Sequence, residues 1–134
     1  MTEVALAPDT PHAPSVIRLL LEKMGITFEE VLDHHGLNAA RKVQAVLLDD
    51  SVGSLMVLYP QSQLLDLNRL TELTGRRLTA VSTERLEKML GKHHLSLLPG
   101  LPSLTSSPCL YEESLLREPM VLVNSGEPGV LLEI

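Results

Sequence analysis

The sequence predicts a single α/β domain, of the α+β type, in which a mixed and mainly antiparallel sheet packs against helices. Three observations favour this fold. The 134 residues suffice for one hydrophobic core. Helical periodicity alternates with short apolar runs along most of the chain, and strand-like runs then follow one another directly, which disfavours a doubly wound sheet. We expect residues 1–15 to be a flexible N-terminal segment and residues 16–134 to form the domain.

The first helix is predicted over residues 16–24, because apolar side chains recur there at helical spacing. Ser15 is a suitable N-cap, and Gly25 stands where a left-handed glycine commonly ends a helix. A short edge strand is expected over residues 26–31, followed by a turn at residues 33–36.

Two continuous apolar runs, Ala45–Leu48 and Leu55–Tyr59, are expected to form a hairpin in the middle of the sheet. Neither run alternates between apolar and polar residues, which is typical of strands covered on both faces. Residues 49–53 form the turn between them. These two strands should therefore lie at the centre of the core.

Two further helices carry clear start signals. Asp66 is expected to cap a helix whose apolar stripe is Leu67, Leu70 and Leu73, and Gly75 should end it.

After a short strand at residues 78–81, Ser82 should cap the next helix, with Glu84 in its first turn and Gly91 at its end. The loop at residues 95–102 is apolar and broken by prolines, so it is either covered or lines a pocket. The last strands are expected at residues 109–111, 120–123 and 130–132.

Composition excludes several classes of protein. The single cysteine, Cys109, permits no intramolecular disulfide, which fits a cytoplasmic protein. No apolar run is long enough to span a membrane, and the first 15 residues lack the basic and apolar regions of a signal peptide. We therefore expect a soluble, cytoplasmic chain with no membrane partner. Aromatic residues make up only 2% of the chain, which disfavours a surface on which nucleic-acid bases stack.

The net charge of −6 argues against binding nucleic acid by general electrostatics. The charge is unevenly distributed, because residues 67–94 carry six basic and three acidic side chains. This region could form a basic face. The alternative, which we favour, is a set of ordinary solvated helix faces with ion pairs such as Glu84 with Lys88.

The common catalytic signatures are absent: the chain has no P-loop, no Gly-x-Gly-x-x-Gly, no His-Glu-x-x-His, no paired Cys-x-x-Cys and no Gly-x-Ser-x-Gly. The pairs His34-His35 and His93-His94 lack further ligands at metal-binding spacing. Cys109 lies in an apolar strand and is interpreted as a buried, inert thiol rather than a nucleophile. We expect no metal and no cofactor.

Several short motifs nevertheless occur in a defined order. In the first half they are the helix at residues 16–24, Gly25-Ile26-Thr27-Phe28-Glu29, the hairpin around Asp49-Asp50, Tyr59-Pro60 and Leu64-Leu65-Asp66-Leu67. In the second half they are Ala80-Val81-Ser82, the stretch Glu84–Gly91, Pro99-Gly100-Leu101 and Tyr111-Glu112-Glu113-Ser114-Leu115 before a closing hairpin. In this order and spacing the sequence resembles the YbaK/prolyl-tRNA-synthetase-associated editing domains over residues 16–134.

That resemblance implies the family's mixed α/β fold and its activity, the hydrolysis of the ester that joins a wrong amino acid to its tRNA. The implied partner is tRNA, or the 3′ end of an aminoacyl-tRNA. Catalysis in the family is associated with a lysine at the start of the first hairpin strand, in a phrase like Lys-Thr-Leu. A Gly-x-x-x-Pro loop shapes the amino-acid pocket.

This sequence departs from the family at both points. An ungapped match on Asp49-Asp50 puts Val43 at the lysine position and Gln44 at the threonine position, with Lys42 one residue before them. A shift of one residue along a strand points a side chain to the opposite face, so Lys42 replaces the lost amine only if the strand bulges or frays. In the loop, Leu95 stands where the glycine should be, before Ser96 and Pro99.

The resemblance leaves two main functions open. One is a binding or regulatory module without catalysis, a pseudoenzyme, whose partner would be a C-terminal regulatory domain in a longer chain, as in fusions to HDOD signalling domains. The other is an active trans-acting deacylase that uses Lys42. A third is a small-ligand pocket bounded by the loop at residues 95–101. The residues expected to line the pocket are Val43, Gln44, His34, His35, Leu95, Ser96, Pro99 and Gly100.

Overall fold

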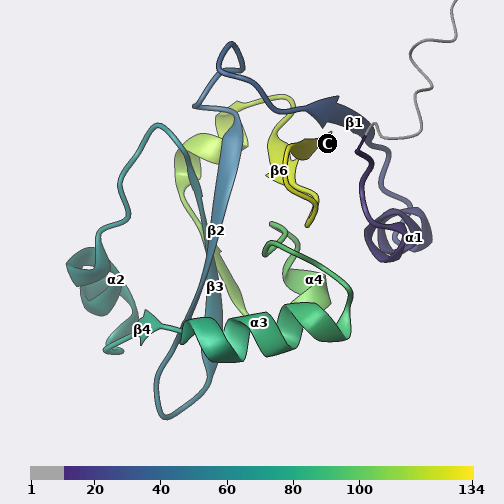
Figure 1. Ribbon diagram of the computed structural model, residues 1–134. Helices are drawn as coiled ribbons and strands as arrows, with labels where there is room; N and C mark the ends of the chain where they lie inside the picture. Colours follow the sequence, from purple (N-terminus) through teal and green to yellow (C-terminus); the bar gives the residue numbers. More distant parts are fainter. Residues whose placement is uncertain (1–10) are drawn as a thin grey trace, which may run out of the picture.

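The computed structural model describes residues 11–134 and has the mixed α/β architecture that the sequence predicts (Figure 1). The expected loose segment at residues 1–15 falls mostly outside the described residues. The elements are, in chain order, α1 (Ser15–Lys23), β1 (Glu29–Leu32), β2 (Lys42–Asp49), β3 (Ser54–Pro60), α2 (Leu67–Thr74), β4 (Thr79–Ala80), α3 (Thr83–Lys92), α4 (Pro102–Thr105), β5 (Cys109–Tyr111), the 3₁₀ helix η2 (Glu113–Arg117), β6 (Leu122–Asn124) and β7 (Val130–Glu133).

The seven strands form one sheet in the order β1-β7-β6-β2-β3-β5, with β4 paired to β2. Among the strands of residues 11–134, only the pairs β2 with β6 and β3 with β5 run parallel, so the prediction of a mixed and mainly antiparallel sheet is confirmed. The hairpin β2–β3 lies in the middle of the sheet, as its uninterrupted apolar runs predict. No helix among residues 11–134 is long and apolar enough to cross a membrane.

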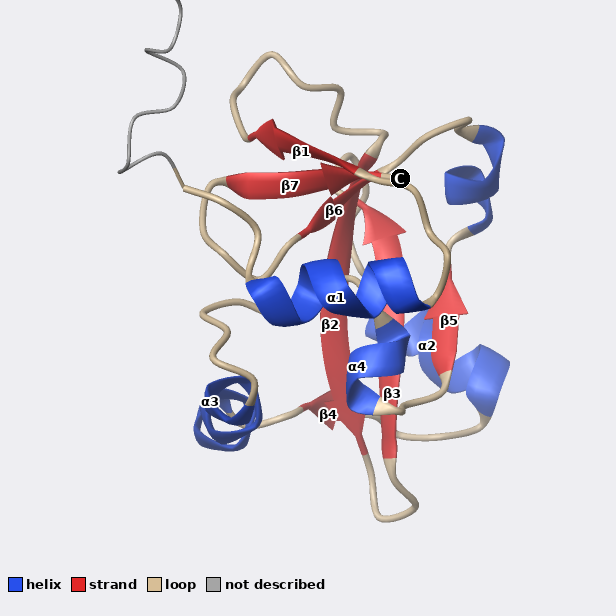
Figure 2. Cartoon of the chain, turned by 90° about the vertical axis from the view of Figure 1, so that its right-hand side faces the viewer, coloured by secondary structure: helices blue, strands red, loops and turns tan. Residues whose placement is uncertain are grey.

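Helices cover both faces of the sheet, and each face has its own apolar cluster. On one face, side chains of α1, α3 and α4 pack with alternate residues of the central strands, among them Val43. On the other face, Leu70 of α2 packs against Leu48 and Val57. Figure 2 shows α1 and α4 in front of the sheet and α2 behind it. Because side chains alternate along β2, Val43 and Leu48 belong to opposite clusters.

Most of the predicted helix ends are confirmed. The side chain of Asp66 accepts hydrogen bonds from two backbone amides of α2, and that of Ser82 accepts one from α3. Gly25 and Gly75 take left-handed φ angles of +72° and +70° after α1 and α2. These ends agree with the sequence because a cap depends only on neighbouring residues.

Two predicted ends are wrong. Ser15 lies inside α1 rather than capping it, and Pro14 occupies the capping position without a side-chain hydrogen bond. Gly91 lies inside α3, which continues to Lys92, and His94 takes the left-handed conformation instead. The amide of His94 bonds the carbonyl of Gly91 and that of Leu95 bonds the carbonyl of Leu90, so a Schellman motif ends this helix one turn later than predicted.

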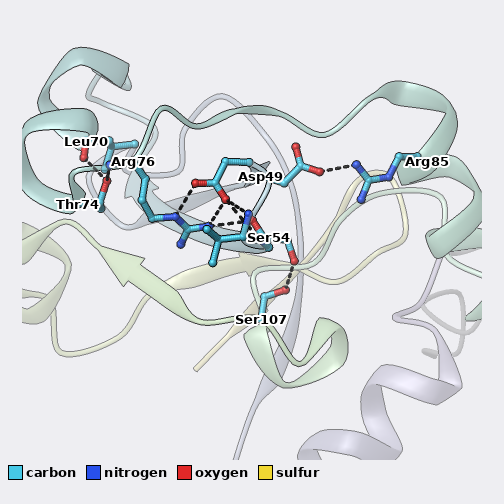
Figure 3. Close-up of polar contacts among 10 residues, drawn as sticks. Asp49, Ser54, Leu70, Thr74, Arg76, Arg85 and Ser107 are labelled. Atoms are coloured by element: carbon cyan, nitrogen blue, oxygen red, sulfur yellow. Dashed lines mark hydrogen bonds and ion pairs between the residues drawn. The ribbon is translucent and has the colours of Figure 1, made fainter.

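The tip of the β2–β3 hairpin is held to the helices by two ion pairs (Figure 3). The guanidinium of Arg76 donates to both carboxylate oxygens of Asp50, at 2.8 and 2.6 Å, and Arg85 of α3 pairs with Asp49. The described residues form these pairs and not the expected one between Glu84 and Lys88. Of the six basic side chains between residues 67 and 94, Arg76 and Arg85 therefore hold the hairpin in place.

The ion pair of Asp50 should make stability fall in acid. The hydrogen bonds from Arg76 hold the pKa of Asp50 well below its ordinary value of 3.8. A depressed folded-state pKa contributes stability that is present above pH 3.8 and is lost as the pH falls below it. We expect Asp50→Asn to lower the urea midpoint at pH 7, and the difference from the unmodified chain to shrink at pH 3. Glu87→Gln on α3 is the control, and an equal loss at both pH values would contradict the assignment.

Candidate functional site

Val43, which is predicted to occupy the position of the family lysine, is buried in an apolar cluster. The side chain of Val43 is 8% exposed, and it belongs to the same cluster as Leu95, which is 7% exposed. Pro99 and Gly100 are also buried, and a Cβ built at Gly100 would lie 3.5 Å from Val123 of β6. The structure thus brings the start of β2 and the loop at residues 95–101 together, with aliphatic side chains between them.

The loop at residues 95–101 is fixed to the turn between β6 and β7. The amides of Ser96 and Leu97 both donate to the carbonyl of Gly126, at 3.0 and 3.2 Å. The side chain of Leu95 lies against Gly126 so closely that a Cβ there would be 2.8 Å from its Cδ2 atom. Of the two expectations for this apolar loop, cover by the rest of the fold is the one that its burial supports.

Lys42 turns away from this cluster. It precedes Val43 on β2 and therefore points to the other face of the strand, as alternation requires. Its ammonium lies 2.7 Å from Oδ1 of Asp33 and donates to the carbonyl of His34 at 3.4 Å. Only 13% of its side chain is exposed. Asp33 was not among the predicted site residues, although it immediately precedes the histidine pair in the sequence.

The other expected site residues divide between these two places. His34 lies beside Lys42, but its Nδ1 atom accepts the backbone amide of Gly36 at 3.0 Å. His35 is exposed on the same turn. Gln44 lies on β2 opposite Tyr59, on the same side of the strand as Lys42. Ser96 is exposed on the loop near Leu95. The structure therefore gathers Val43, Leu95, Pro99 and Gly100, and separately Lys42 and His34.

Cys109 is half-buried on β5, and burial raises the pKa of its thiol. A raised pKa keeps the thiol protonated and weakly nucleophilic at neutral pH, although the residue is less buried than the sequence predicts. Among residues 11–134, no three histidine, cysteine, aspartate or glutamate side chains gather in the way that a metal site needs.

A family model describes the chain. The model of the aminoacyl-tRNA editing domain matches residues 23–134, which include every expected site residue. A comparison with curated proteins gave no significant match.

Several solved structures share the fold. A candidate signal transduction protein from Marinobacter aquaeolei VT8 superposes with a TM-score of 0.81 and 24% identity, covering 92% of this chain. This chain spans only 27% of that protein. A candidate trans-editing enzyme for prolyl-tRNA synthetase gives a TM-score of 0.72 and 20% identity, covering 92% of this chain and 88% of its own. The hypothetical protein APE2540 gives a TM-score of 0.70 and 17% identity, and the match covers 88% of this chain and 87% of that protein's chain.

At these identities the structural likeness establishes the fold alone, whereas the family model matches most of the sequence itself. The resemblance seen in the order of the sequence motifs is confirmed. The chain belongs to the aminoacyl-tRNA editing domain family.

Proposed function

We propose that this domain keeps the editing fold but does not hydrolyse aminoacyl-tRNA, and that it serves as a binding or regulatory module. One observation carries the proposal. The side chain that faces the loop at residues 95–101 from the start of β2 is the buried, aliphatic Val43. The side chain of valine can neither donate a hydrogen bond nor carry charge, so it can neither stabilise a developing oxyanion nor position water.

The second departure supports the same conclusion. Glycine in a binding loop allows a ligand to approach the backbone closely, and a leucine there fills that space. Leu95 packs against Gly126 within the apolar cluster rather than pointing into solvent. An aminoacyl group would have to displace this side chain, which costs the free energy of its burial.

A deacylation assay tests the proposal. We expect the purified domain, incubated with a panel of mischarged tRNAs, to release amino acid at the spontaneous rate only. An active trans-editing enzyme assayed on the same tRNAs is the positive control. Release well above the spontaneous rate for any member of the panel would show that the domain is catalytic.

A second candidate is an active deacylase that uses Lys42, with His34, His35 or Ser96 placing water at the ester carbonyl. The observation in its favour is that the ammonium of Lys42 lies 3.4 Å from the backbone carbonyl oxygen of His34, which brings the two residues to one place. The ion pair between Lys42 and Asp33 counts against this mechanism, because the amine is already engaged. If activity is found, Lys42→Ala should abolish it, whereas activity retained in that variant would exclude this mechanism.

The proposed regulatory role would place the domain in the cytoplasm as part of a longer protein, for example joined to an HDOD-type signalling region. The structural neighbour described as a candidate signal transduction protein supports this, because a domain of this fold makes up 27% of that chain. The length of the reading frame that encodes this sequence tests the idea directly.

A further inference from the structure

A groove with a volume of about 570 Å³ lies between α2 and β5, on the face of the sheet opposite Val43. Its floor is apolar and includes Val57, Leu70 and Leu110. Leu58 is the one residue that both lines the groove and packs against the cluster around Leu95. The groove is therefore a second candidate site, separate from the family's editing pocket.

Large apolar side chains surround the groove but are left in solvent. Leu64 is 97% exposed, Leu73 is 68% exposed and Tyr111 is 54% exposed, and all three line the groove. The sequence predicts Leu73 on the buried stripe of α2, yet Leu70 is the buried member of that stripe. Isolated exposed leucines are ordinary, but several gathered around one groove mark an interaction surface.

The strand beside the groove has an open edge. β5 ends the strand order of the sheet and pairs only with β3 among the described residues. The carbonyl of Pro108 and the amide of Glu112 bond to β3. Backbone groups alternate in direction along a strand, so those of Cys109 and Tyr111 point away from the sheet. Figure 2 shows β5 at the margin of the sheet with α2 behind it. An open edge of this kind can accept another strand.

The rim of the groove is acidic. Asp66, Glu112 and Glu113 line it, with Arg69 as the one basic lining residue. The hydroxyl and amide of Ser114 donate to the carboxylate of Glu112 and lower its pKa, and the charge of nearby Arg117 adds to this effect. Gln63 bonds both Glu112 and Ser114, which ties the loop after β3 to the segment after β5. A ligand with positive charge complements this rim.

We propose that this groove binds an extended segment of a partner protein, which pairs with the open edge of β5. On such a strand, alternate side chains point toward α2, where apolar ones would cover Leu70 and Leu73, and flanking lysine or arginine side chains would meet Glu113. A second copy of this chain fits less well, because it would bring the same acidic rim against this one. The groove lies on the face of the sheet opposite Val43, so peptide binding and the proposed loss of catalysis can each fail without the other.

A displayed library of random ten-residue peptides tests the proposal. We expect the domain to enrich peptides with apolar residues at alternate positions and at least one lysine or arginine. Titration of the most enriched synthetic peptide should shift amide NMR signals of residues 64–73 and 109–113. A peptide with proline at the positions that pair with β5 should lose binding at least about tenfold, because proline removes the backbone donor.

Matched variants separate the apolar and charged contributions. Leu73→Glu should weaken the peptide about tenfold or more and Glu113→Lys about threefold to fivefold. Leu19→Glu on α1 and Glu87→Lys on α3 are exposed controls away from the groove and should leave the affinity unchanged. Failure to enrich any peptide, signal shifts around Val43 and Leu95 instead, or concentration-dependent dimerisation that Leu73→Glu abolishes would each overturn the proposal.

Discussion

Val43→Lys is expected to destabilise the domain by about 3 kcal/mol or more, measured as the free energy of unfolding in urea at pH 7. The valine is 8% exposed and is surrounded by aliphatic side chains, including Leu95 and Val123. An ammonium at this position would lose its hydration among the aliphatic side chains that pack around Val43. The substitution that places an amine at the predicted position of the family lysine is therefore expected to be costly in this core.

Val43→Met is the matched control, because it lengthens the side chain without adding charge, and this overpacking alone should cost about 1–3 kcal/mol. The cost of the lysine should also fall as the pH rises and the amine loses its proton. Unfolding of the lysine variant at the same urea concentration as the unmodified chain would mean that the hollow around Val43 is open to water. That result would also weaken the case against catalysis.

Leu95→Ala is expected to cost about 2–5 kcal/mol, since it removes a buried side chain from a packed cluster and leaves a cavity. The more exposed Leu97 provides the control, and Leu97→Ala should cost about 1 kcal/mol or less. Urea unfolding of the three proteins measures the difference. Similar losses for both alanine variants would indicate that Leu95 does not fill the loop.

The contact between Leu95 and Gly126 can be isolated by a double-mutant cycle. Gly126→Ala introduces a Cβ that would lie 2.8 Å from Leu95, at a residue whose φ is +93°. In the Leu95→Ala background the steric overlap disappears and only the backbone strain remains. Gly126→Ala should therefore cost about 1 kcal/mol less in that background. Additive losses would rule out the contact.

Local features of the fold were predictable from the sequence. The caps at Asp66 and Ser82, the left-handed Gly25 and Gly75, and the central hairpin depend on residue type and on neighbours a few positions away. The end of α3 was misplaced because Gly91 is compatible with a helix interior, and His94 accepts the left-handed conformation within the Schellman motif.

Strand parity made part of the site predictable as well. Counting from Asp49-Asp50 identified Val43 and Lys42 as neighbours that face opposite ways, and they lie in different surroundings in the structure. Nothing in the local pattern of β2 indicated that Asp33 would meet the ammonium of Lys42. That contact depends on the path of the chain between β1 and β2, and the pattern of apolar residues in the strands does not specify this path.

The family and the order of the elements could be predicted from the amino-acid sequence alone, because both depend on residue type and spacing. Which face of each element is covered depends instead on how the elements pack together. Helical spacing places Leu67, Leu70 and Leu73 on one stripe of α2. Whether each of these leucines is buried depends on how far the sheet extends beneath α2, and the sheet ends at β5. The groove beside that edge exists because no further strand or helix among the described residues reaches it.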